Sequence, residues 1–235
     1  MNLTTPRRSV PALLAAVALL LTGCGGDDEG RGTPAREPDD APSTTSPYGG
    51  HAHHGMGELS SVEDAAAIGP GPSVGDRWEI PVGISVCGQF IEAPEGGPVD
   101  GVSATKGGKA VVEPTDEAAT GHAATLGSYA EAIGATLRTG VLRLPADVVP
   151  TEIEVGDEDI ALGGHTFRTG DMCGTTPGAV QAWVYSADAV SSGKGILTVV
   201  TDPDRIPFAE DGMALVIAFA PDSSLPTLPP SAVIG

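Results

Sequence analysis

The sequence predicts an α+β domain that follows a flexible tether, and three observations favour this fold class. Apolar, β-branched runs bounded by Gly, Pro and Asp recur between residues 78 and 221, as strands separated by turns do. Residues 121–140 instead carry apolar side chains at helical spacing. Residues 24–58 hold hardly any apolar side chain beyond Ala and Met, so they cannot offset the entropy of ordering them. We expect a mostly antiparallel sheet of about five strands with one packed helix, of which a β-grasp-like arrangement is one form.

The expected elements follow in chain order. The strand segments are WEIPVGISVCGQFI (78–91, one or two strands), KAVVEP (109–114), GAVQAWVYSADAV (178–190), GILTVVTD (195–202) and MALVIAFAP (213–221). Between the second and third of these, Leu126, Ala130, Ile133 and Leu137 recur at helical spacing, and Gly140 is the expected helix stop.

The N-terminus predicts export and lipid anchoring. Arg7 and Arg8 precede the apolar run VPALLAAVALLL, which is too short for a permanent membrane span and has the build of a signal peptide. The run ends in LTGC, which resembles the lipobox of bacterial lipoproteins, whose cysteine is acylated. The resemblance implies lipidation of Cys24, and two acyl chains on one residue anchor a protein stably. The alternative is an ordinary cleavage site with Cys24 as a leftover thiol.

These segments define the expected organisation and location of the chain. We expect a lipoprotein signal peptide at residues 1–23, a lipidated, disordered, acidic tether at 24–72 and an extracytoplasmic α+β domain at 73–235. The protein would sit on the outer face of the cell membrane. A formal net charge of -19 disfavours binding to nucleic acid or to anionic headgroups through a basic patch.

A histidine cluster lies within the expected tether. Residues 48–57 read YGGHAHHGMG and place His51, His53, His54 and Met56 close together. Imidazoles and a thioether suit copper, and this segment offers four such groups without needing a fold. The alternative is a polar tail that carries histidines without a physiological metal. We expect weak copper or zinc binding here at most, and no other cofactor.

Cys87 and Cys173 are the cysteines that remain after Cys24. An even number of cysteines in an oxidising compartment favours a disulfide. Closing a loop of 86 residues would stabilise the fold by about 4 to 5 kcal/mol on the chain-entropy model. The alternative is a catalytic cysteine served by His122 or His165.

Four blocks carry a wider resemblance: VGDRWEIPVGISVCGQF, GHAATLGSYAEAIG, TGDMCG and IPFAEDGMALVIAFAPDSSLPTLPP. In order and spacing they resemble an uncharacterised family of actinobacterial membrane-anchored or secreted proteins, over about residues 73–231. That family carries a D-H-W-H block before the first cysteine and a block like G-I-H-T-H-G-D-G-L-I-H-I-H-P after it. The resemblance implies a set of histidines that could hold a metal.

This chain departs from the family at those two blocks. The first block reads Asp76-Arg77-Trp78-Glu79 in this chain, and residues 101–114 align with the second block. The family's histidine positions are occupied here by Arg77, Glu79, Ser103, Thr105, Val111 and Glu113. Two carboxylates and an arginine are a poor ligand set for a soft metal. The framework is therefore present without the ligands that the family implies.

Three functions stay open on this sequence. We favour a non-enzymatic, lipid-anchored envelope protein that binds a partner or serves structurally. The second is a metal-binding lipoprotein that handles copper or zinc through His51, His53, His54 and Met56. The third is an enzyme, which a pocket gathering Glu113, His122 and Asp171 would favour.

Overall fold

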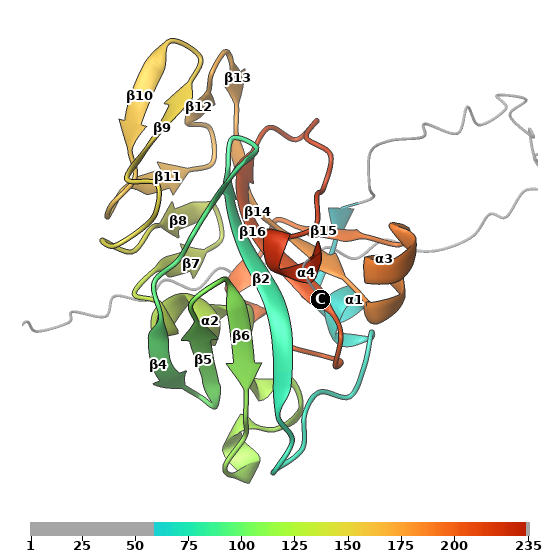
Figure 1. Cartoon of the computed structure of the whole chain (residues 1–235). Helices are drawn as coiled ribbons and strands as arrows, with labels where there is room; N and C mark the ends of the chain where they lie inside the picture. The colour runs from blue at the N-terminus through green and yellow to red at the C-terminus, as the bar shows by residue number, and fades with distance from the viewer. Residues whose placement is uncertain (1–58, 234–235) are drawn as a thin grey trace, which may run out of the picture. The chain divides into compact units, whose positions relative to one another are not determined.

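A nine-stranded mixed sheet forms the centre of the fold. The computed structural model describes residues 59–233 (Figure 1). Strands follow the order β1-β15-β14-β16-β2-β6-β5-β4, and β3 pairs with β2. The pairs β1–β15 and β16–β2 are parallel, and the other pairs of this sheet are antiparallel. The strands are β1 Leu59–Ser60, β2 Trp78–Val86, β3 Gln89–Ile91, β4 Gly96–Val99, β5 Val102–Thr105, β6 Lys109–Val112, β14 Ala179–Tyr185, β15 Leu197–Val199 and β16 Ala214–Ala220.

Smaller sheets and short helices surround this sheet. A three-stranded sheet has the order β11-β8-β7, and two hairpins pair β9 with β10 and β12 with β13. Their strands are β7 Thr136–Arg138, β8 Val141–Arg143, β9 Glu152–Val155, β10 Glu158–Ala161, β11 Thr166–Arg168, β12 Met172–Cys173 and β13 Thr176–Pro177. The helices are α1 Val62–Ala66, α2 Leu126–Ala132, α3 Ala187–Ser192 and α4 Pro230–Val233, with 3-10 turns at Glu117–Ala119, Gly121–Ala123 and Pro203–Arg205. Within residues 59–233, no helix has the length and apolar character needed to span a bilayer.

The two faces of the large sheet bury separate clusters. Successive strand residues point to opposite faces. One face of β2 places Ile80, Val82, Ile84 and Val86 in the main core, which also takes in the buried side of α2. On β14, Trp183 and Tyr185 point the other way and form a second cluster with small residues of β16 and Ala189 of α3. Figure 1 shows α4 lying over β2, and the C-terminal Leu228 and Ala232 pack on this second cluster.

The α+β prediction is confirmed, and the sheet is larger than expected. Each of the five expected segments contains at least one strand of the large sheet, and 78–91 forms two. The strands that were not predicted are two to four residues long. Runs this short cannot show a reliable period of two, so their pairing depends on tertiary contacts.

The expected helix is shorter than its apolar spacing suggested. It covers Leu126–Ala132, whereas Leu137 lies on β7. Gly134 has φ +77, and the N–H groups of Gly134 and Ala135 donate to the carbonyls of Glu131 and Ala130. These two bonds form a Schellman motif, which stops a helix where glycine takes the left-handed conformation. The stop is therefore Gly134 and not Gly140.

The folded part also begins earlier than Ser73, the expected boundary. Residues 59–66 form β1 and α1, although they were assigned to the tether. Ser61 caps α1: its hydroxyl accepts from the Asp64 N–H at 3.1 Å, and its own N–H donates to Asp64 Oδ2 at 2.8 Å. Hydrogen bonds from the Ser61 N–H and hydroxyl lower the pKa of the Asp64 carboxyl. Ala65 is fully buried, so this segment belongs to the core.

Candidate functional site

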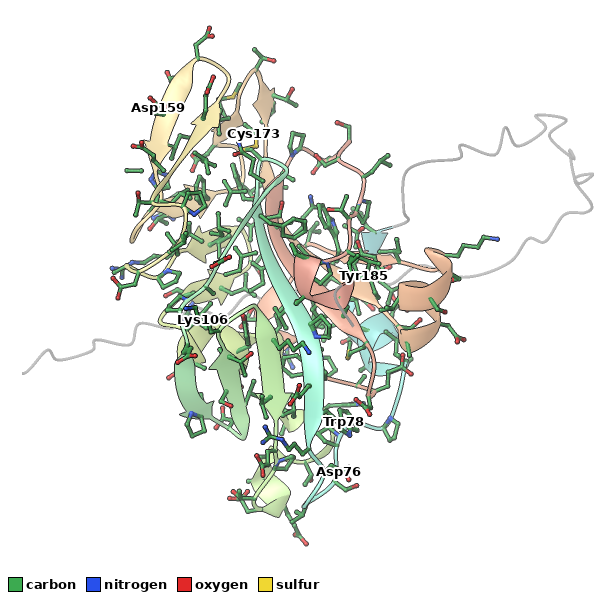
Figure 2. The ribbon with its side chains drawn as sticks, viewed as in Figure 1. Asp76, Trp78, Lys106, Asp159, Cys173 and Tyr185 are labelled. Atoms are coloured by element: carbon green, nitrogen blue, oxygen red, sulfur yellow. A yellow bond between two sulfur atoms is a disulfide. The ribbon has the colours of Figure 1, made fainter. Side chains whose placement is uncertain are left out.

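Cys87 and Cys173 form a disulfide, as predicted, with their Cα atoms 5.5 Å apart. Cys87 and Gly88 are the two loop residues between β2 and β3, and their φ values of 50 and 84 fit a type I′ hairpin turn. The bridge joins this turn to β12, and Figure 2 labels Cys173 at that end of β2. Because both sulfurs are paired, neither cysteine offers a thiol for catalysis.

The six positions at which the sequence resemblance implied histidines share one sheet face. Glu79 of β2, Val111 of β6 and Ser103 of β5 lie opposite one another across three neighbouring strands. Arg77 and Glu113 lie one row further along, and Thr105 lies two residues beyond Ser103 on the same face. The two blocks that are distant in sequence therefore converge, as a shared site would require.

In this chain that face carries ion pairs. Arg77 Nη1 lies 2.7 Å from Glu113 Oε2, and Arg77 Nη2 lies 3.8 Å from Glu79 Oε1. Lys109 Nζ lies 3.7 Å from Glu79 Oε2. The side chains of Arg77 and Glu113 are 55% and 53% exposed, so each pair stabilises the fold by at most about 1 kcal/mol. We name this network, made by Arg77, Glu79, Lys109 and Glu113, the ion-pair face.

The residues considered for catalysis do not gather. Glu113 binds Arg77, His122 Nε2 lies 2.8 Å from the Gly69 carbonyl oxygen, and Asp171 accepts from the Arg168 N–H at 2.7 Å. Each is thus bound to a different local partner.

His165 and the acidic run 157–159 carry side chains of the types that bind metals. His165 packs against Phe167, with ring centroids 4.4 Å apart. The acidic run 157–159 lies at the turn of the β9–β10 hairpin, where Figure 2 labels Asp159. Across residues 59–233, no group of three or more His, Cys, Asp or Glu side chains is placed to hold a metal. Cys24, His51, His53, His54 and Met56 lie outside the described residues.

A pocket of about 580 Å³ opens at the other end of the large sheet. We name it the Gln181 pocket. Its wall comes from β14, from β15 and the residues after it, from Leu59 of β1, and from the C-terminal segment. The lining residues are Leu59, Thr139, Gly140, Thr169, Ala179, Val180, Gln181, Trp183, Thr198, Val200, Thr201, Asp222, Ser224 and Pro226.

The pocket exists because two neighbouring strands differ in length. β15 pairs with β14 only at residues 182–184, so residues 179–181 of β14 have no strand beside them on that edge. The Val180 N–H donates instead to Thr169 Oγ1 at 3.1 Å. After β15 the chain turns away at Asp202, whose φ is 50. Thr139 fixes that turn, since its Oγ1 donates to Asp202 Oδ1 at 2.7 Å and accepts from the Asp202 N–H at 2.8 Å.

Gln181 places a buried polar group in this pocket. Its side chain is on the face of β14 that carries Trp183 and Tyr185, and the residue is 3% exposed. Within residues 59–233 its Nε2 has no hydrogen-bond partner. Leaving a buried amide unpaired costs about 1 to 3 kcal/mol, so such a group needs an explanation. The hydroxyls of Ser85, Tyr129 and Tyr185 are likewise buried without a partner in residues 59–233, but of these four residues Gln181 is the one in the lining of this pocket. Burial raises the pKa of the Tyr185 phenol.

A second pocket of about 780 Å³ is more polar. Charged side chains of both signs line it, among them Asp100, Glu131, Asp204, Arg138 and Arg205. The buried polar side chain in its wall, Ser128, is satisfied because its hydroxyl donates to Asp100 Oδ2 at 3.3 Å. This pocket therefore lacks the unpaired buried group that distinguishes the Gln181 pocket.

The sequence contains a signal for the Gln181 pocket. Gln181 interrupts the apolar run AVQAWVY, and a polar residue inside a buried strand either finds a partner or marks a site. The gap beside residues 179–181 of β14 could not be predicted, because the gap depends on where β15 stops pairing with β14. No family model, curated protein or solved structure matches the chain, so the geometry alone carries the assignment of this site.

Proposed function

We propose that this chain is a lipid-anchored, non-enzymatic binding module of the cell envelope, and that the Gln181 pocket holds its ligand. The buried, unpaired amide of Gln181 is the observation that carries this proposal. The volume of the Gln181 pocket, about 580 Å³, lies within the usual range of about 300 to 1,000 Å³ for small-molecule sites. A few placed polar groups in a mainly apolar wall are typical of such sites.

The chemistry of the lining supports binding over catalysis. Its polar side chains are Gln181, four threonines at 139, 169, 198 and 201, Ser224 and one carboxylate, Asp222. General acid–base catalysis needs a titratable group held against the reacting atoms. Asp222 is exposed at the rim, and the hydroxyls of Thr139 and Thr169 are already engaged by Asp202 and Val180.

The anchor is the second part of the proposal and depends on Cys24 in LTGC. Lipidation there would hold the folded unit at the outer membrane surface. We expect the wild-type protein to partition with membranes and Cys24→Ala to be released or left unprocessed. Unchanged detergent partitioning of Cys24→Ala would contradict the anchor.

Ligand retention tests the pocket in the cell. Protein purified from the envelope is extracted with organic solvent, and the extract is analysed by mass spectrometry. Ala179, half-buried on the pocket wall, is changed to Phe to fill the pocket; Ala161→Phe, on the exposed strand β10, is the matched control. We expect a compound in the wild-type and Ala161→Phe extracts that Ala179→Phe lacks. Identical extracts from all three would contradict a ligand in this pocket.

A second proposal is copper or zinc binding by His51, His53, His54 and Met56. Because residues 59–233 hold no competing cluster of ligands, any affinity of the chain for these metals is expected in that segment. Copper is titrated into the Cys24→Ala chain and into the same chain with the three histidines changed to alanine. Binding that survives those substitutions would contradict this proposal. The family resemblance and the β-grasp-like arrangement also stay proposals.

A further inference from the structure

We infer that the Gln181 pocket takes an uncharged molecule that presents one amide group on an apolar body. This inference rests on the proposed function, because it names the class of ligand for that pocket. It combines three properties of the lining: the chemistry of the buried polar group, the sign of the charge and the character of the wall.

The buried polar group selects an amide. The Gln181 side chain has a donor end, Nε2, and an acceptor end, Oε1. An amide on the ligand also has one of each, so it can pair with whichever end of the Gln181 amide faces the pocket. Nε2 is buried without a partner within the described residues, so a ligand that turns the amide toward the pocket would supply the missing hydrogen bond. A site built for a polar group rejects analogues that lack it, because its own group is then left unpaired.

The charge of the lining argues against an anion. No lysine, arginine or histidine is among the lining residues, and the charged residue there is Asp222. A carboxylate or phosphate on the ligand would have to leave water without a cation to receive it. A net charge of -19 for the chain adds a long-range repulsion of anions. The one carboxylate in the lining, Asp222, is exposed and screened by water, so it stabilises a buried cation little.

The wall and rim favour an apolar body. Val180, Val200, Trp183 and Pro226 contribute apolar surface to the wall. Leu59, one of the large apolar side chains that stay exposed, is 71% exposed and lines the pocket. Exposed apolar groups around an apolar cavity are typical of ligand sites.

A matched series of eight-carbon compounds tests the inference: octanamide, octanoate and octylammonium. The protein is the Cys24→Ala chain with Trp78→Phe, which leaves Trp183 as the sole tryptophan because the chain has two. Trp183 lines the pocket, so its fluorescence reports occupancy. We expect a saturable change with octanamide, and at least tenfold weaker binding of octanoate and octylammonium. Gln181→Leu should weaken octanamide about tenfold, which is the loss of one hydrogen bond.

Two variants locate the binding, and circular dichroism checks that each is folded. Ala179→Phe should abolish the octanamide signal, and Ala161→Phe should leave it unchanged. If the phenylalanine variant does not fold, Ala179→Leu fills the pocket with a smaller side chain and takes its place in the test.

Three results would overturn the inference. These are octanoate or octylammonium binding as tightly as octanamide, Gln181→Leu leaving octanamide binding unchanged, and no binding of octanamide. If a charged probe binds and Ala179→Phe blocks it, the pocket remains a binding site and only the ligand class is wrong. If no probe binds and the envelope extracts also hold no ligand, the proposed function fails as well.

Discussion

The two ends of the large sheet treat their polar side chains in opposite ways. At the ion-pair face, Arg77, Glu79, Lys109 and Glu113 are paired with one another and stay in solvent. At the Gln181 pocket, an uncharged amide is buried and has no partner within the described residues. The first arrangement costs little and gains little, whereas the second costs free energy unless something binds. The comparison teaches that charge density marks a solvated surface here, and that an unpaired buried group in the wall of a pocket marks the candidate site.

The strand β2 connects the two regions, because it pairs with β6 on one edge and on the other with β16, the neighbour of β14. The disulfide holds the turn at its end, so removing it should weaken both regions together. We expect Cys87→Ala combined with Cys173→Ala to lower the free energy of unfolding by about 2 to 5 kcal/mol, the usual cost of losing a native disulfide. Urea unfolding followed by circular dichroism measures the change. A loss below about 1 kcal/mol would mean that the bridge does not constrain the unfolded chain as argued.

Gln181→Leu sharpens the comparison at the pocket. In the absence of ligand it should raise the free energy of unfolding by about 1 kcal/mol, because an apolar side chain of similar size leaves no unpaired amide. The matched control is Gln89→Leu, since Gln89 is exposed and its Nε2 donates to the Glu154 carbonyl at 2.8 Å. That control should be neutral or slightly destabilising. A loss of more than about 1 kcal/mol in Gln181→Leu would show that the amide is a structural group with a partner.

Arg77→Gln should have the smallest effect. It removes the ion pairs to Glu79 and Glu113, which are more than half exposed, so we expect a loss of less than about 1 kcal/mol that shrinks further in high salt. Thermal unfolding at low and high ionic strength measures it. A loss comparable with that of the disulfide variant would break the comparison, because the ion-pair face would then be an energetic centre of the fold.

Much of the fold was readable from the sequence where the pattern was long. The apolar runs at 178–190 and 213–221 contain β14 and β16, and the segment 78–91 forms the β2–β3 hairpin. The helix end was misplaced because Leu137 continues the helical spacing, while the local preference of Gly134 for positive φ decides the stop. The parallel pairing of β16 with β2 joins residues more than a hundred positions apart, which no local pattern encodes.

The candidate site was less readable than the fold. The sequence resemblance implied a site at the positions around Glu79 and Glu113, and the register of β2, β6 and β5 brings these positions to one face. Their chemistry in this chain is that of paired surface charges. The Gln181 pocket instead arises from the early end of β15 and from the Thr139–Asp202 hydrogen bonds, which are tertiary facts.

The side-chain amide resonances test the central claim most directly. The chain has two glutamines, Gln89 and Gln181, and one asparagine, Asn2, which lies in the expected signal peptide. A ¹⁵N–¹H spectrum of the exported Cys24→Ala chain should therefore show two side-chain amide pairs, assigned by their loss in Gln181→Leu and Gln89→Leu. Adding octanamide should shift the Gln181 pair saturably and leave the Gln89 pair in place, because Gln89 lies outside the pocket. A Gln181 pair that stays unmoved at saturating octanamide would contradict the claim that this buried amide is the ligand-binding group.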